Sequence, residues 1–129
     1  MINFVTGGTG FIGKRLICAL RKEQINVRLL SRKKLNKNTI VCDLKVDSIP
    51  DDSLIGVDTI FHLAGFSHDM RDATKIQNIY QRVNVDATIR LAKLAVKSNI
   101  KKFIFVSSVK AGGAPDFGVC ESEKDQGDP

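Results

Sequence analysis

A glycine cluster directly after an apolar segment constrains the fold of this chain most. The segment Ile2–Thr6 runs into Thr6-Gly-Gly-Thr-Gly-Phe-Ile-Gly13, which fits both G-x-G-x-x-G and G-x-x-G-x-x-G. Phe11–Lys22 follows, with apolar residues at helical spacing. The pattern predicts a strand, a tight turn and a helix. A turn without side chains lets the backbone approach a pyrophosphate, whose charge is met by free N–H groups and the helix dipole.

Further strands and helices alternate along the chain. Short, mostly apolar and β-branched segments predict four more strands, over Asn26–Leu30, Thr39–Cys42, Thr59–Leu63 and Lys102–Val106. Strands of this composition are typical of a parallel sheet covered on both faces. Right-handed crossovers then give a doubly wound α/β (Rossmann) domain with strand order 3-2-1-4-5.

Two helices are expected to bury an apolar stripe. In the first, the expected stripe consists of Ile12, Leu16, Ala19 and Leu20. In the second, over Val83–Ser98, it consists of Val85, Ile89, Ala92 and Val96. Residues 66–82 are polar and weakly periodic, and Ser48–Ile55 predicts a short helix or turn. Cys18, within the first helix, is expected to be buried.

Ligands of doubly wound sheets bind beyond the carboxyl ends of the strands, where the strand order reverses. The segments that follow the predicted strands are therefore the candidate site: Gly7–Gly13, Ser31–Lys33, Asp43–Leu44, Ala64–Ser67 and Ser107–Ser108.

The charge distribution argues against a nucleic-acid partner. The chain has 129 residues and a net charge of +6, and its excess is local: residues 21–40 hold seven basic side chains and one acid. No aromatic residues are interleaved with them to stack on bases. The cluster suits one small anionic ligand or a solvated face.

The sequence also lacks the marks of a membrane or metal protein. No apolar run approaches the ~20 residues that span a bilayer, and no signal peptide is evident, so a cytoplasmic location is the default expectation. Three cysteines without ligand spacing predict neither disulfides nor a metal site.

The end of the second strand bears on cofactor choice. An acid usually stands there to bind the ribose 2′-hydroxyl of NAD, whereas this chain has Ser31-Arg32-Lys33. Arg32 and Lys33 suit a 2′-phosphate, which favours NADP over NAD; the alternative is that both are solvated loop charges. Asp43, after the third strand, is a candidate for the adenine amino group or for a turn.

The segments Thr6–Gly13, Cys42–Leu44, His62–Gly65, Asn84–Thr88 and Phe103–Lys110 together resemble those of extended short-chain dehydrogenase/reductases. More narrowly, the chain is similar to the NAD(P)-dependent nucleotide-sugar epimerase/dehydratase branch, which includes UDP-glucose 4-epimerase. The resemblance covers essentially all 129 residues. It implies a nucleotide-sugar substrate and hydride transfer between a sugar carbinol and the nicotinamide.

The resemblance also implies residue roles. It places the adenine contact on Asp43 and Leu44, the catalytic serine on Ser108, and the cofactor path along Leu63, Ala64 and Gly65. The remaining cofactor contacts are expected at Gly7, Gly10, Phe11, Ile12, Gly13, Asn84 and Ser107. Asn84 either bonds backbone across the sheet or caps the helix. His62 is interpreted as a packed strand residue.

One element of the resemblance is missing from the chain. The branch uses a Tyr-x-x-x-Lys pair as its acid/base. The only tyrosine here, Tyr80, precedes the strand that leads to Ser107 and Ser108, and the residue four positions after it is Asn84, not a lysine. We therefore expect residues 1–129 to be an incomplete Rossmann domain, the N-terminal portion of a longer enzyme that ends before the last strands and the substrate domain. Such a portion is expected to be inactive, and its exposed strand edge favours association, a homodimer included. The alternatives are a non-catalytic NADP-binding sensor and a reductase of small hydrophobic ketones.

Overall fold

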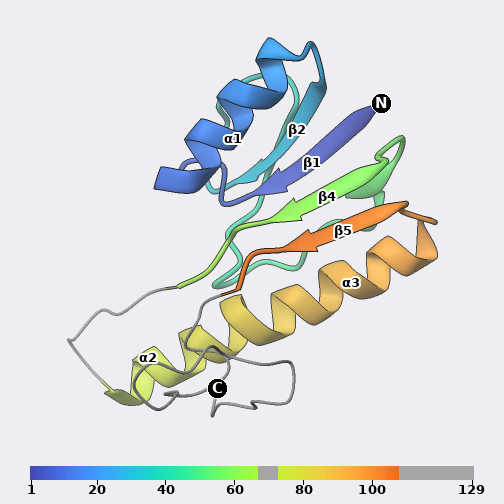
Figure 1. Cartoon of the computed structure of the whole chain (residues 1–129). Helices are drawn as coiled ribbons and strands as arrows, with labels where there is room; N and C mark the ends of the chain where they lie inside the picture. Colours follow the sequence, from blue (N-terminus) through green and yellow to red (C-terminus); the bar gives the residue numbers. More distant parts are fainter. Residues whose placement is uncertain (67–72, 108–129) are drawn as a thin grey trace, which may run out of the picture.

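A five-stranded parallel sheet forms the centre of the molecule. The computed structural model describes residues 1–66 and 73–107, and its strands lie in the order β3-β2-β1-β4-β5. Their bounds are β1 (Ile2–Thr6), β2 (Asn26–Ser31), β3 (Thr39–Val41), β4 (Thr59–His62) and β5 (Lys102–Phe105). Each expected strand is present within one residue at either end, and the predicted doubly wound order is confirmed (Figure 1).

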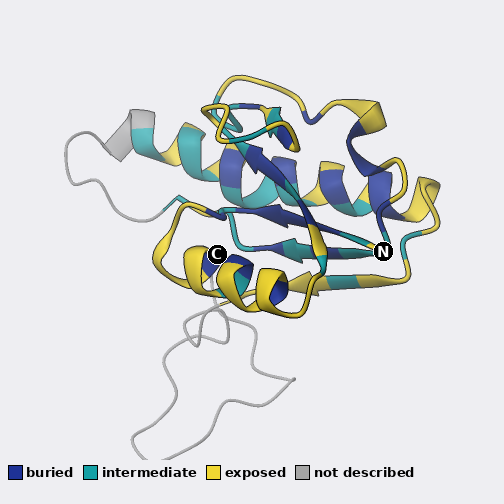
Figure 2. Cartoon of the chain, turned by 90° about the horizontal axis from the view of Figure 1, so that it is seen from above, coloured by how far each residue is buried: buried dark blue, intermediate teal, exposed yellow. Residues whose placement is uncertain are grey.

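The helices cover the two faces of this sheet unequally. Helix α1 (Phe11–Lys22) joins β1 to β2, and a short 3₁₀ turn η1 (Asp51–Leu54) precedes β4. Between β4 and β5 lie α2 (Ala73–Tyr80), the π-helical turn η2 (Gln81–Asp86) and α3 (Ala87–Lys97), which follow one another without a break. The second helical region thus begins about ten residues earlier than its apolar periodicity indicated. Figure 2 shows the sheet between α1 and the α2–α3 segment.

Alternation along β1 divides the interior into two cores. Phe4 packs with Ile60 and Leu91 on the face covered by α3, whereas Val5 packs with Ile17 and Leu29 under α1. Both Phe4 and Val5 are fully buried, because β1 lies at the middle of the sheet with a helix on each side. The strand that precedes the glycine cluster is therefore held rigidly from both faces.

The side of helix α1 that packs on the sheet differs from the expected apolar stripe. Gly13, Ile17 and Leu20 are buried, whereas Ile12 and Cys18 are exposed. The expectation was right for Leu20 and for Leu16, which packs half-buried against the same core, and wrong for Ile12, Ala19 and Cys18. Gly13 explains the difference, because its backbone packs directly on the glycine turn and so sets the rotation of the helix.

The stripe expected on α3 is also wrong. The buried residues of the η2–α3 segment are Val83, Ala87, Leu91, Leu94 and Ala95, whereas Ile89 and Val96 are exposed. Both sets have helical spacing, so periodicity alone could not choose between them. The helix buries the set that contains its two leucines.

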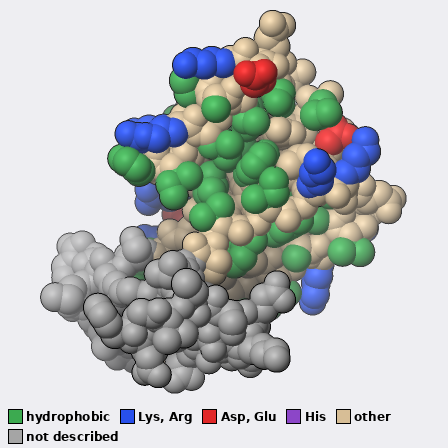
Figure 3. Space-filling view, viewed as in Figure 1, with side chains coloured by type: hydrophobic (Ala, Val, Ile, Leu, Met, Phe, Trp, Pro, Cys, Tyr) green, Lys and Arg blue, Asp and Glu red, His purple; other side chains and the backbone are tan. Residues whose placement is uncertain are grey.

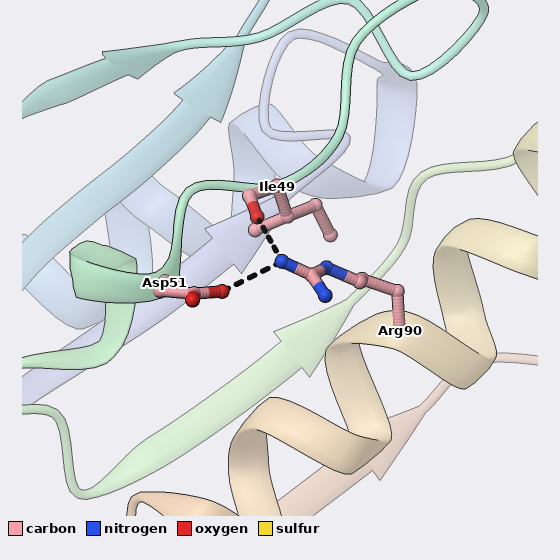
Figure 4. A network of polar contacts seen from close by, with 3 residues as sticks. All are labelled: Ile49, Asp51 and Arg90. Atoms are coloured by element: carbon pink, nitrogen blue, oxygen red, sulfur yellow. Dashed lines mark hydrogen bonds and ion pairs between the residues drawn. The ribbon is translucent and has the colours of Figure 1, made fainter.

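A side chain of α3 also holds the loop that leads into β4. The Arg90 guanidinium donates to the Ile49 carbonyl at 3.3 Å and to Asp51 Oδ1 at 2.6 Å (Figure 4). Both charged side chains are largely exposed, so the ion pair itself adds little stability. Its bond to the Ile49 carbonyl fixes the loop against α3, beside the fully buried Ile49 side chain.

Strand β5 is the least covered strand. Ile104 and Val106 are 38% and 43% exposed, and Phe61, the partner of Ile104 on β4, is half-buried. Phe61 packs with the residues under α1, so these side chains share the face of α1, beyond the reach of that helix. Figure 3 shows hydrophobic side chains gathered on the face of the molecule turned toward the viewer. The sheet thus presents an apolar surface beside β5.

The corrected stripe on α3 can be tested by two truncations on one helix. Leu91→Ala is expected to lower the free energy of unfolding by about 2–5 kcal/mol, because Leu91 is fully buried against Phe4 and Ile60. Val96→Ala, at a side chain 79% exposed, is expected to change it by less than about 0.5 kcal/mol. Urea denaturation of the two variants measures both values, and comparable losses would contradict the assignment of faces.

Candidate functional site

The glycine turn is held by contacts that only glycine permits. Gly7 has a φ of +69°, and a Cβ there would lie 2.6 Å from both the Ala64 nitrogen and the Leu63 carbonyl carbon. A Cβ on Gly13 would collide with the Gly7 carbonyl oxygen and lie 2.7 Å from Gly8 Cα. The turn after β1 is therefore packed, backbone on backbone, against the end of β4 on one side and the start of α1 on the other.

The first turn of α1 presents unpaired donors. Gly10 occupies the N-cap position, where its N–H donates to the Gly7 carbonyl at 3.1 Å and no side chain caps the helix. The amides of the first helical turn have no partner within the helix, and the turn has no acidic residue. Phe11 and Ile12 stand exposed there, at 74% and 56%. This end of α1 has the donors and the dipole to hold an anion.

A cleft of about 420 Å³ opens beside this turn, at the carboxyl ends of β1 to β4. Eleven residues expected in the site line it: Gly7, Thr9, Gly10, Ser31, Arg32, Asp43, Leu44, Leu63, Ala64, Gly65 and Phe66. Its other lining residues are Leu30, Cys42, Lys45 and Val83. Because these segments follow four different strands, the fold brings together positions far apart in the sequence.

The remaining expected residues lie outside the lining of the cleft. Phe11, Ile12 and Gly13 belong to the adjoining helix start, and Lys33 is exposed beyond Arg32. Ser107 is exposed after β5. Ser108, the expected catalytic serine, and Ser67 lie outside the described residues.

Asp43 forms a local turn at the edge of the cleft. Its Oδ1 accepts the Lys45 N–H at 3.0 Å, while its own N–H donates to Asp47 Oδ2 at 2.7 Å. The side chain thus has the turn role that its loop position allowed. This turn brings Lys45 into the cleft, where its ammonium lies 5.1 Å from the centre of the Phe66 ring.

Asn84 contacts the far wall of the cleft rather than its interior. Its Oδ1 accepts the Phe66 N–H at 2.7 Å, and its Nδ2 donates to the Phe66 carbonyl at 3.1 Å. Of the two alternatives open from the sequence, Asn84 therefore bonds backbone of another segment, the loop after β4. Phe66 in turn packs edge-on against Tyr80, with 5.3 Å between ring centres.

Two buried groups near the cleft stay uncharged at neutral pH. Burial, with Asp47 and Asp43 nearby, raises the pKa of the Cys42 thiol to about 11. Burial lowers the pKa of His62 to about 4. His62 is fully buried between Thr6 and Thr88, which confirms its interpretation as a packed strand residue.

Sequence reasoning missed part of the lining. Leu30, near the end of β2, and Cys42, directly after β3, belong to predicted strands, and the side chains of both line the cleft. Lys45 and Val83 gave no signal, because tertiary packing of the Asp43 turn and of η2 places them there. In the described part of the chain, no helix is long and apolar enough to cross a membrane.

Comparison with known proteins agrees with this geometry. Residues 3–129 match the family model described as the NAD dependent epimerase/dehydratase family. The chain belongs to the NAD-dependent epimerase/dehydratase family. The resemblance inferred from the sequence motifs is thereby confirmed at the level of the family.

Relatives within this family are considerably longer. The chain is 33% identical to the UDP-glucose 4-epimerase of Vibrio cholerae over 122 residues, which cover 90% of this chain and 37% of the relative. It is 31% identical over 115 residues to a 3-beta-hydroxysteroid dehydrogenase of Mycolicibacterium neoaurum, covering 81% of this chain and 31% of that relative. Among solved structures, MoeE5 in complex with UDP-glucose and NAD superposes on the whole chain with a TM-score of 0.82 and 33% identity. The match covers 43% of that chain. The chain therefore spans about two fifths of the length of such family members.

The neutral state of His62 predicts a pH dependence of stability. The unfolded chain takes up a proton at His62 near pH 6.5, whereas the folded chain does so only near pH 4, so the unfolded state binds more protons between these values. Stability therefore rises with pH through this window, by about 3 kcal/mol from this residue. Urea unfolding of the wild type and of His62→Gln at pH 4.5, 5.5, 6.5 and 7.5 measures the difference. Parallel pH profiles for the two proteins would contradict a neutral, buried His62.

Proposed function

We propose that the cleft binds NAD(P) and that the chain is the dinucleotide-binding part of a UDP-glucose 4-epimerase-like enzyme. The observation that carries the proposal is the packing of Gly7 on the Leu63–Ala64 backbone beside the uncapped first turn of α1. This packing leaves open backbone donors at one end of a cleft that extends along Arg32, Asp43 and Leu44. The relatives named as UDP-glucose 4-epimerase, and MoeE5 with UDP-glucose and NAD, support the substrate class.

The residues divide among three parts of the cofactor. In this proposal the free amides of residues 11–13 hold the pyrophosphate, with Gly7 and Gly10 allowing its close approach. Asp43 and Leu44 contact the adenine. Leu63, Ala64 and Gly65 line the path toward the nicotinamide, and Asn84 holds that path in place through Phe66.

The proposed reaction follows from the cofactor and from the two serines after β5, Ser107 and Ser108. A bound nicotinamide would accept a hydride from a sugar carbinol, which becomes a ketone, and in an epimerase the reduced cofactor would return the hydride to the opposite face of that ketone. In this proposal Ser108 orients the reacting hydroxyl; it follows Ser107, which stands two residues after the end of β5 in the sequence. Proton removal belongs to the Tyr-x-x-x-Lys pair of the family, which residues 1–129 do not contain.

Arg32 favours NADP as the finer cofactor choice. It is the guanidinium that lines the cleft directly after β2, and the segment Ser31–Lys33 contains no carboxylate to bind a 2′-hydroxyl. The exposed neighbour Lys33 does not line the cleft, which makes it a matched control for charge alone.

Substitution of Arg32 should therefore separate the two dinucleotides. Arg32→Ala is expected to weaken NADP⁺ binding about tenfold or more, through loss of a charge-assisted contact to the 2′-phosphate, and to change NAD⁺ binding less than about threefold. Lys33→Ala is expected to have a smaller effect on both. Isothermal titration of the 129-residue chain with each dinucleotide measures these affinities. An equal loss for NAD⁺ and NADP⁺ would exclude the 2′-phosphate role.

The proposal also predicts binding without turnover by this chain. With the acid/base pair absent, purified residues 1–129 with NAD⁺ should not interconvert UDP-glucose and UDP-galactose above the uncatalysed rate. A coupled assay of UDP-glucose formation, with a full-length UDP-glucose 4-epimerase as positive control, measures this. Measurable epimerisation would overturn the assigned division of roles, whereas failure to bind either dinucleotide would overturn the proposed function itself.

A further inference from the structure

A closed ring of hydrogen bonds surrounds the wall of the cleft after β4. The Ala64 N–H donates to Thr6 Oγ1 at 3.1 Å, and Thr6 Oγ1 lies 2.7 Å from His62 Nδ1. On the other side of the imidazole, Nε2 lies 2.8 Å from Thr88 Oγ1, which donates to the Asn84 carbonyl at 2.9 Å. The Asn84 side chain closes the ring on Phe66, two residues after Ala64.

The donors of this ring determine the imidazole tautomer. Thr88 gives its only hydroxyl proton to the Asn84 carbonyl, so toward His62 it can only accept, and Nε2 must carry a proton. Thr6 accepts the Ala64 N–H, and its own proton needs an acceptor, which an unprotonated Nδ1 supplies. The neutral Nε2–H form therefore satisfies every hydroxyl of the ring.

The other protonation states of His62 leave a buried group unpaired. An Nδ1–H form would donate to Thr6, which then receives two donors and has no acceptor in the ring for its own proton. The doubly protonated form has the same defect and adds a charge. Among the described residues, the side chains that contact the imidazole from β1, α3 and β5 are Thr6, Thr88, Phe103 and Phe105, and none of these can neutralise a charge.

The π-turn η2 allows both ends of the ring to meet. In this turn the Ala87 N–H donates to the Arg82 carbonyl, five residues back. The Asn84 side chain can thus face Phe66 while Thr88, four residues later, faces His62. Short π-helical segments occur often at functional sites.

We propose that His62, held as its neutral Nε2–H tautomer between Thr6 and Thr88, is a positioning residue that fixes the cleft wall Leu63–Phe66. The ring joins the strand before the glycine turn to the backbone on which Gly7 packs, so it sets the spacing between the two sides of the cleft. The effect on cofactor affinity rests on the proposed function. The tautomer and the hold on the wall do not.

The tautomer can be observed directly in the unliganded chain. Long-range ¹H–¹⁵N correlation spectra of the uniformly labelled protein, with His62 assigned by its loss in His62→Gln, should show a pyrrole-like Nε2 and a pyridine-like Nδ1 from pH 5.5 to 8. An Nδ1–H form, or averaged signals that titrate near pH 6.5, would overturn the proposal.

Matched threonine variants test the hold on the wall. Thr88→Val removes the bridging hydroxyl, and native-state amide exchange at Ala64 and Phe66 should accelerate about tenfold more than exchange of the slowest core amides. Thr88→Ser keeps the hydroxyl and should restore the wild-type rates. Thr39→Val is the control, because it removes another buried hydroxyl with hydrogen bonds of its own, outside the ring. Uniform acceleration in Thr88→Val, or the same local pattern in Thr39→Val, would reduce the ring to general packing and refute the proposal.

A binding measurement connects the ring to the cofactor. Thr88→Val should raise the Kd for NAD⁺ at least about fivefold at a temperature where the variant remains fully folded, and Thr88→Ser should bind as the wild type does. Unchanged affinity in Thr88→Val would overturn the positioning role. A wild-type chain that binds neither NAD⁺ nor NADP⁺ would overturn the proposed function alone, because the spectra and the exchange rates decide the ring without any ligand.

Discussion

The contact between Gly7 and the Leu63–Ala64 backbone is the constraint on which the site depends. It brings the turn after β1 within van der Waals distance of the turn after β4, at the point where successive connections leave the sheet on opposite faces. Side chains at this point would separate the two strand ends. With none at Gly7, the start of α1 and the loop after β4 form two walls of one cleft.

Burial supplies the rigidity that this contact requires. β1 is enclosed by one core under α1 and another under α3, so the strand end that leads into Gly7 has little freedom to move. Thr6 and His62, both fully buried, hydrogen-bond each other, and His62 also bonds Thr88 of α3. Unpaired, each would lower stability; paired, they connect β1, β4 and α3 with defined geometry.

The sequence was sufficient to predict the order of strands and the segments that meet in the cleft. Both follow from local signals, the glycine spacing and the β-branched runs, combined with the handedness of parallel connections. The helix faces could not be predicted in the same way. α1 is rotated by the backbone packing of Gly13, and α3 has two apolar stripes of equal spacing, so the choice between them depends on tertiary packing. Likewise, the sequence did not indicate that the turn at Asp43 places Lys45 in the cleft.

The π-turn between α2 and α3 has a consequence for insertions and deletions in this segment. A π-turn accommodates one residue more than an α-helical turn, so η2 amounts to a single-residue insertion in an otherwise regular helix. Deleting one residue within 81–86 would let this segment close as an ordinary α-helical turn, because one residue fewer at about 100° each rotates the chain nearly as far as the wider π-turn does. Tyr80 and Thr88 would therefore still face Phe66 and His62, and the side chain displaced would be Asn84 within the turn. The extra residue thus serves the placement of Asn84 and not the phase of the two helices.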